Sequence, residues 1–373
     1  MAGLERLINN DGGIPLYSDG HLLIGPAASS AVPGLYTIEP SQPKESIADL
    51  DDTELTLFAY MQRQLRTELK TKFDVAVCGL YMEEHPGQRL ISYTMPFHVD
   101  RLSERFSIEV YQPHIAEYLK SYTDASSSQQ VSEFDAGMRN MLSRSETRAD
   151  IEGILHGTSR EITVTAHSED PLERKPDIDE ILEVFDENEL PLPLTGKKYY
   201  VCIGGDKNFQ CFLSDNSMSK GEFIFSHEDD IDDCLKPVYS DDYVVVRQDA
   251  KYAIPGFYIV SPKAHYRRID QTPQDVFERC MFMVRDVRQG LLTLGIKQAH
   301  VYHDEKYNSP ASVHFWVLPL HSRYIAERGL NPTILSRDIW TYLDTFPRYN
   351  VTKPQIIEFN KEMKIYLDAK HQP

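Results

Sequence analysis

The sequence is short of the features that mark several classes of protein. Its five cysteines are widely spaced and form no CxxC pair, which gives no zinc framework and is typical of free thiols in a reducing compartment. No stretch approaches the roughly eighteen uninterrupted apolar residues of a membrane-spanning helix. The polar start MAGLERLINNDGG lacks the apolar centre of a secretion signal. We therefore expect a cytoplasmic protein with no membrane contact.

Positive charge is also scarce. The 373 residues include 39 Lys/Arg against 57 Asp/Glu, a formal net charge of -18. Because binding to a nucleic-acid duplex depends on cations that neutralise phosphates, this balance argues against an extended nucleic-acid surface. It still permits a small anionic ligand in a locally basic pocket. The 41% hydrophobic and 26% charged content is typical of a globular protein, and the length predicts two domains of about 150 to 200 residues.

An internal repeat organises the chain. PLYSDGHLLIGPAASSAVPGLYTIEP (residues 15–40) aligns without a gap onto PVYSDDYVVVRQDAKYAIPGFYIVSP (residues 237–262), at an offset of 222 residues. With one shift of register, RLISYTMPFH (residues 89–98) aligns onto SVHFWVLPLH (residues 312–321). The shared turn residues, among them a Pro-Gly pair, make chance a poor explanation. The sequence therefore predicts two units of the same structure.

Both units show the same order of elements. Apolar periodicity predicts strands at 21–25, 35–39, 74–82 and 90–97 around a helix at 51–73, and strands at 243–247, 257–261, 298–304 and 313–320 around a helix at 273–295. The fold class is thus α+β, an antiparallel sheet plus one long helix per unit. We expect the two sheets to join within one chain, which gives a monomeric pseudo-dimer without exposed central edges.

The segment between the repeats differs in composition. We divide the chain into a first unit (1–105), a helical and acidic insert (106–196) and a second unit with a helical tail (197–373). DASSSQQVSEFD (residues 124–135) indicates a surface linker, and DIDEILEVFDENEL (residues 177–190) a solvated acidic helix that could cover a pocket or recruit a protein partner. The alternating, Gly-containing stretch that follows predicts a hairpin, with IGGDKNF as its turn and no phosphate loop.

One histidine of the second unit lies within an apolar run. Because a strand alternates its faces, His314 shares a face with Ser312 and Trp316, while Val313 and Phe315 share the core face. Residues 255–325 hold nine Lys/Arg against six Asp/Glu, whereas residues 33–100 hold six against eleven. This local basicity favours an anionic ligand in the second unit. A packed histidine in a second core layer is the alternative.

The order of YIVSPKAHYRRI, a long helix, Asn-Ser and SVHFWVLP resembles the histidine-triad (HIT) superfamily of nucleotide hydrolases and transferases. Two such units in one chain resemble its galactose-1-phosphate uridylyltransferase and diadenosine polyphosphate phosphorylase branch. The resemblance implies that His314 is the nucleophile and that Asn308 and Ser309 contact the phosphate. It implies that His265, after Lys263, supports the triad. The triad is degenerate.

Ser312 stands where the family has its first histidine, and Trp316 where it has its third. Either side chain can donate a hydrogen bond to the phosphate, but neither exchanges a proton near pH 7, and the loss of such a group commonly costs about 10²- to 10⁴-fold in rate. His321, Lys263 and His303 are candidates to replace it. The first unit has Ile91 at the nucleophile position, so it serves as a structural partner.

His300 and His303 lie three residues apart in a predicted strand and therefore on opposite faces, which disfavours a metal site. We predict no metal and no cofactor. Two functions remain open: a nucleotide hydrolase or nucleotidyltransferase that acts at an α-phosphate through a covalent His314 intermediate, and a non-catalytic protein that binds a nucleotide or sugar phosphate. Both imply a small anionic nucleotide or sugar-phosphate ligand.

Overall fold

The computed structural model describes residues 15–27, 32–98, 118–119, 122, 125–157, 199–202, 210–213, 236–249, 252, 254–264, 266–305, 313–333, 337–345 and 349–371. The strands of the first unit are β1 (Tyr17–Ser18), β2 (Leu22–Pro26), β3 (Tyr36–Pro40), β4 (Val77–Glu83) and β5 (Ile91–Phe97). Those of the second are β8 (Tyr239–Ser240), β9 (Val244–Gln248), β10 (Tyr258–Pro262), β11 (Ala299–Asp304) and β12 (Phe315–Pro319). Between them lie β6 (Tyr199–Cys202) and β7 (Gln210–Leu213). The helices are η1 (Ile47–Asp49), α2 (Asp52–Phe73), α4 (Ala125–Ser143), α5 (Ser145–Leu155), η9 (Ile269–Gln271), α7 (Gln274–Thr293), α8 (Ser322–Arg328), α9 (Arg337–Thr345) and α10 (Tyr349–Lys370).

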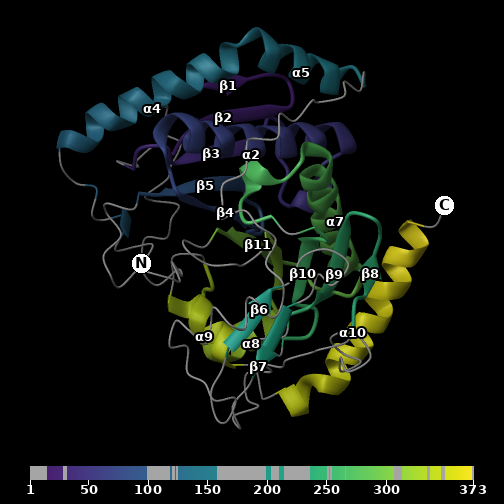
Figure 1. The fold of residues 1–373 in the computed structure, drawn as a ribbon. Helices are drawn as coiled ribbons and strands as arrows, with labels where there is room; N and C mark the ends of the chain where they lie inside the picture. The colour runs from purple at the N-terminus through teal and green to yellow at the C-terminus, as the bar shows by residue number, and fades with distance from the viewer. Residues whose placement is uncertain are drawn as a thin grey trace.

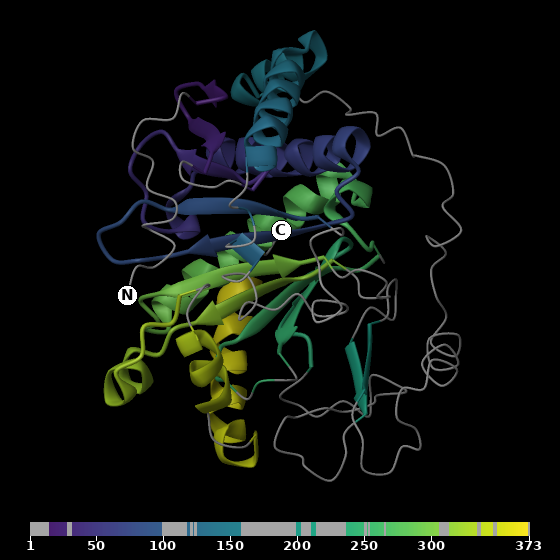
Figure 2. The same cartoon turned by 90° about the vertical axis from the view of Figure 1, so that its left-hand side faces the viewer.

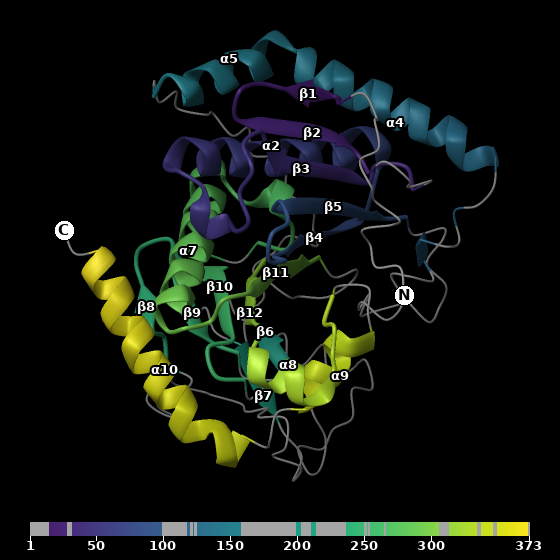
Figure 3. The same cartoon turned by 180° about the vertical axis from the view of Figure 1, so that it is seen from behind.

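Ten strands form one antiparallel sheet whose order is β1-β2-β3-β5-β4-β11-β12-β10-β9-β8. The order of the first five strands is repeated, reversed, in the last five, and Figure 3 shows them one below another from β1 to β11. The units meet where β4 pairs with β11, from His300 opposite Glu83 to Asp304 opposite Gly79. The predicted pseudo-dimer is therefore the observed fold, and the central strand edges are paired within the chain.

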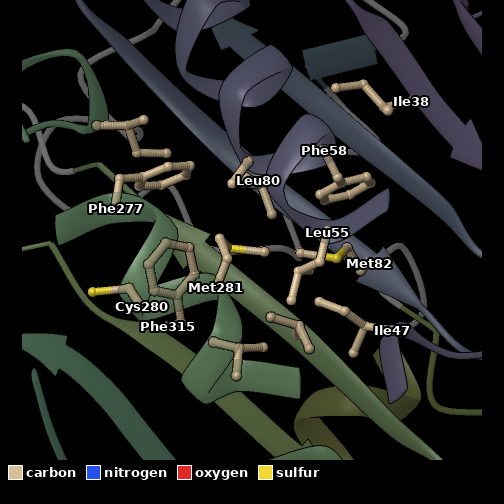
Figure 4. Packing of buried hydrophobic residues seen from close by; sticks show 14 of the residues in the cluster. Ile38, Ile47, Leu55, Phe58, Leu80, Met82, Phe277, Cys280, Met281 and Phe315 are labelled. Carbon is tan, nitrogen blue, oxygen red and sulfur yellow. The ribbon is translucent and has the colours of Figure 1, made fainter. Parts of the chain in front are cut away.

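The long helices α2 and α7 lie side by side on one face of this sheet, here called the helix face (Figure 1). α2 begins after Asp51, whose side chain accepts a hydrogen bond from the Glu54 amide, while the Glu54 carboxylate accepts one from the Asp51 amide. It ends at Asp74, which adopts a left-handed conformation. Apolar side chains of α2, of α7 and of every inner strand except β5 pack into one core, which continues across the seam between β4 and β11 (Figure 4).

Equivalent residues make equivalent contacts in the two units. Tyr17 donates a hydrogen bond to Asp19, and Tyr239 donates one to Asp241. The Pro-Gly turns place Gly34 and Gly256 at φ 84° and 81°, where a side chain would be unfavourable and would also meet packed neighbours. For Gly34 those neighbours include Phe134 of α4, and for Gly256 they include Phe359 of α10. α4 and α10 are therefore corresponding helices.

Two buried ion pairs tie each unit to the other. Arg66 of α2 lies 2.7 Å from a Glu305 oxygen, and Arg288 of α7 lies 2.7 Å from a Glu84 oxygen. Each arginine also donates to two carbonyl groups after its own helix, and each glutamate accepts from a backbone amide at the start of the opposite central strand, Cys78 or Ala299. This reciprocal arrangement fixes the register of the seam.

The stretch 124–135 is not a linker. All but its first residue lies in α4, because Phe134, Met138, Met141 and Leu142 recur at helical spacing and bury one side of the helix against the first unit. Figures 1 and 2 show α4 and α5 at the β1 end of the sheet and α10 at the β8 end. The expected hairpin forms, with β6 antiparallel to β7. The expected acidic helix at 177–190 and the turn at 203–209 lie outside the described residues.

None of the helices in the described parts of the chain combines the length and the apolar character that a bilayer crossing requires.

Candidate functional site

The candidate site lies on the sheet face opposite the two long helices, here called the far face. The predicted alternation is confirmed: Val313, Phe315 and Val317 pack in the helix-face core, whereas Leu318 packs in a separate far-face cluster, with Trp316 against it. His314 immediately precedes β12, and its ring lies 4.7 Å from the Trp316 ring, edge to face. His314 is only 3% exposed. The site is therefore a second packed layer and not an open surface.

His303 fixes the backbone of His314 from the neighbouring strand. Its Nδ1-H donates to the His314 carbonyl oxygen at 2.9 Å, one residue beyond the last paired residues of β11 and β12, Tyr302 and Trp316. Burial on the helix face lowers the pKa of His303, which keeps the ring neutral. The strands thus remain adjacent at His314. His303 itself packs against Phe315, so it lies on the wrong face to replace a triad histidine.

Asp304 contributes a buried carboxyl group to this region, and Tyr81 of the first unit forms a hydrogen bond with it. Tyr81 of β4 donates a hydrogen bond from its hydroxyl to the Asp304 carboxyl group, and both residues are buried. The Tyr81 ring lies over Gly79, since a Cβ at that position would overlap the phenol. Gly79 is also the residue paired with Asp304 across the seam. The glycine therefore allows Tyr81 to reach the second unit.

The strand registers place two polar residues on either side of His314. β11 and β12 pair Tyr302 with Trp316, and continuing this register brings Asp304 opposite His314. β10 and β12 pair Ile259 with Trp316, and the same step brings Ser261 opposite His314 from the other side. Residues opposite each other in an antiparallel pair have Cβ atoms about 4.5 to 5.5 Å apart. Asp304 and Ser261 are thus neighbours of His314 that the sequence alone did not assign to its surroundings.

His321 has a structural role that the repeat duplicates. Its Nε2-H donates to the Pro255 carbonyl at 2.8 Å, and its backbone amide donates to the Tyr342 hydroxyl. His98 of the first unit bonds Pro33 and Tyr118 in the same way. Both histidines hold a Pro-Gly turn against a strand end. Because this bond occupies Nε2 of His321, that nitrogen is not available to a ligand in this structure.

The other residues predicted from the sequence are placed only in part. Lys263 follows β10 as a half-buried residue, and its amide donates to the Tyr243 carbonyl at the β9 side. Asn308, Ser309, Ser312 and His265 lie outside the described residues. Their roles as phosphate contacts or support for the triad remain predictions.

His300 and His303 lie on opposite faces, as predicted. His300 is on the far face, where its ring packs on Tyr302, and its Nε2-H donates to the Pro332 carbonyl at 2.8 Å. Burial lowers its pKa, which keeps it neutral. Among the described residues, no group of three His, Cys, Asp or Glu side chains could hold a metal ion.

The local basicity of the second unit does not amount to a basic pocket in the described regions. Arg285 and Arg288 reach across to Asp52 and Glu84 of the first unit. Two further arginines pair with acids of their own unit, Arg279 with Asp241 and Arg268 with Asp270. Much of the excess positive charge therefore stabilises the fold. A count of Lys and Arg residues does not show which of these charges are already paired.

No family model and no curated protein matches the sequence. Among solved structures, the chain is similar to a uridylyltransferase mutant, with 9% identity over 94% of this chain and 92% of the other and a TM-score of 0.46. It is also similar to an ADP-glucose phosphorylase from Arabidopsis thaliana with bound ADP-glucose, with 8% identity, 92% and 82% coverage and a TM-score of 0.45. A GalT-like protein from Arabidopsis thaliana is similar with 8% identity over 90% of this chain and 83% of the other, and with a TM-score of 0.42. At such identities and TM-scores, none of these structures assigns a role to a residue of this chain.

Proposed function

We propose that the protein is a nucleotidyltransferase or nucleotide phosphoester hydrolase that forms a covalent intermediate on His314. The observation that supports this most is the difference between the units at one position. The strand of the first unit has Ile91 where that of the second has His314. The fold therefore does not require a histidine there, and His314 has acid and hydroxyl groups on both neighbouring strands.

The chemistry requires a neutral imidazole. One ring nitrogen of His314 donates its lone pair to the α-phosphorus, and the P-O bond to the leaving group breaks with its electron pair. An acceptor oxygen, from water or a phosphate, then attacks phosphorus and the N-P bond returns its pair to the imidazole. When water is the acceptor, its proton passes to solvent. His303 supports this chemistry by holding the His314 backbone at 2.9 Å.

A non-catalytic binding protein is the second candidate, and the burial of His314 favours it. A nucleophile must reach its phosphorus atom, yet His314 is 3% exposed and packs against Trp316. Such a protein would keep the fold and a site for a nucleotide or sugar phosphate without turnover. Both candidates share the ligand class and differ in whether a covalent adduct forms.

The deciding experiment is adduct trapping. The purified chain is incubated with a panel of nucleoside diphosphate sugars, including ADP-glucose, and dinucleoside polyphosphates, and its intact mass is measured. We expect an acid-labile nucleotidyl adduct that peptide mass spectrometry assigns to His314 and that His314→Ala abolishes. Ile91→Ala, at the corresponding position of the first unit, is the matched control and should keep the adduct. Full turnover by His314→Ala would contradict the mechanism, whereas binding by thermal shift without adduct or turnover would favour the second candidate.

A further inference from the structure

We propose that the two units build the site together: Tyr81 of the first unit is a positioning residue that holds the Asp304 carboxyl group beside His314, where it stabilises the positively charged imidazolium. This inference rests on the proposed function, because a nucleotidyl-histidine carries that positive charge while the intermediate exists. It gives the first unit a part in the chemistry, beyond serving as a structural partner.

The geometry places Asp304 where such a charge is useful. Asp304 and His314 are on adjacent strands and on the same face, and the bond from His303 to the His314 carbonyl keeps these strand ends together. Both side chains are buried, Asp304 at 7% and His314 at 3% exposure. A carboxylate within about 4 to 6 Å of a histidine, shielded from water, favours the protonated ring.

Tyr81 has a clear reason to act on Asp304. Its hydroxyl donates to one carboxyl oxygen, and the missing side chain at Gly79 leaves the phenol room to lie there. The Tyr81 ring packs edge to face on Tyr302 across the seam, with centroids 6.4 Å apart. A phenol held on both its ring and its hydroxyl fixes the carboxyl rotamer. Preorganised charge of this kind stabilises an ion without reorganisation at the moment of reaction.

The titratable groups of the neighbouring elements are Tyr81 of β4, Tyr302, His303 and Asp304 of β11, Arg66 of α2, and Glu305 directly after β11. Burial raises the pKa of Tyr302 and lowers that of His303, so both are neutral near pH 7. Arg66 and Glu305 pair with each other on the helix face. Asp304 is therefore the carboxyl group that the continued β11–β12 register places opposite His314 on the far face.

The test measures the pKa of His314 directly, by NMR of ¹³C-labelled histidine in the full-length chain, with the His314→Gln variant to assign the signal. We expect Asp304→Asn to lower this pKa by about one unit and Tyr81→Phe to lower it by less. The matched control is Glu83→Gln, since Glu83 lies at the other end of the same seam, opposite Ile91 instead of His314. This control should leave the pKa of His314 unchanged.

An unchanged pKa in folded Asp304→Asn, or an equal decrease in Glu83→Gln, would overturn the inference. If Asp304→Asn does not fold, Tyr81→Phe decides: no decrease in this variant would also overturn it. The titration needs no substrate, so its result is separate from the fate of the proposed function. If the wild type forms the His314 adduct, Asp304→Asn should form it about 10-fold more slowly, with an altered pH profile.

Discussion

The two ends of the β4–β11 seam offer a direct comparison, because the chain places corresponding residues there in different surroundings. At one end Gly79 gives Tyr81 room to bond Asp304; at the other, His300 occupies the position that corresponds to Gly79. The hydroxyl of Tyr302, the counterpart of Tyr81, has no hydrogen-bond partner within the described parts of the chain. The choice of glycine or histidine at this one position therefore decides whether the seam tyrosine can bond a carboxyl group of the opposite unit.

The helix face differs between the units in another way. In the first unit Gln62 bonds Ser92 at 2.6 Å and Thr94 at 2.9 Å in a buried network. At the corresponding positions the second unit has Val284, Phe315 and Val317, all in the apolar core. The reciprocal arginine and glutamate pairs are the same in both. The comparison teaches that the arginine–glutamate pairs between the units are held constant while the interior of each unit varies.

The largest effect should follow from breaking a contact that the units share. Arg66→Met and Arg288→Met each leave a buried glutamate without its cation, so each should lower the free energy of unfolding by about 3 to 5 kcal/mol. Urea denaturation measures both. Lys70→Ala, which removes an exposed pair with Asp74, is the control and should change stability by less than about 0.5 kcal/mol. Clearly unequal losses for the two arginines would show that the seam is not symmetric in energy.

A smaller effect should separate the two seam tyrosines. Tyr81→Phe removes a buried hydrogen bond to a carboxyl group and should lower the free energy of unfolding by about 1.5 to 3 kcal/mol. Tyr302→Phe removes a buried hydroxyl that makes no hydrogen bond among the described residues, so stability should be unchanged or slightly higher. The same urea titrations compare them. If Tyr302→Phe were as damaging as Tyr81→Phe, the contrast between the two ends of the seam would be wrong.

The smallest effect concerns pH. His303 corresponds to Met82, and burial lowers its pKa in the folded state. As pH falls below about 6.5, the unfolded chain binds a proton that folded His303 does not, and stability declines by up to about 1.4 kcal/mol per pH unit. His303→Met removes this loss. It should be less stable than wild type by about 1 kcal/mol at pH 7.5, through the lost bond to His314, and should match it near pH 5.5.

Urea midpoints at both pH values test this prediction, and Met82→His, the reverse exchange, should make the acid sensitivity greater. If the stability of wild type and of His303→Met changed with pH in the same way, His303 would bind its proton as readily in the folded protein as in the unfolded chain.

Much of the fold was legible in the sequence because it is periodic and repeated. The helix expected at 51–73 is α2 at Asp52–Phe73, and the strand expected at 298–304 is β11 at Ala299–Asp304. The stretch 124–135 was misread, because Ser128, Gln129, Gln130 and Ser132 face solvent on a helix that buries Phe134. Composition alone could not reveal that face, since the apolar residues that define it extend to Leu142.

Less of the candidate site could be predicted from the sequence, because its residues are far apart along the chain. Alternation placed His314 and Trp316 on one face correctly, because it depends only on local backbone geometry. Tyr81 and Asp304 are 223 residues apart in the sequence. Their hydrogen bond depends on the register between β4 and β11 and on the absence of a side chain at Gly79. The repeat aligned corresponding residues, but it did not say which of them meet across the seam.

The seam also has a consequence for how such a protein can change. In a dimer of identical chains, every substitution near the two-fold axis occurs twice, so corresponding positions could not hold glycine in one half and histidine in the other. Here the axis passes between Tyr81 and Tyr302 of one chain, and each side is encoded separately. A single change can therefore alter one end of the seam while the other end stays as it was.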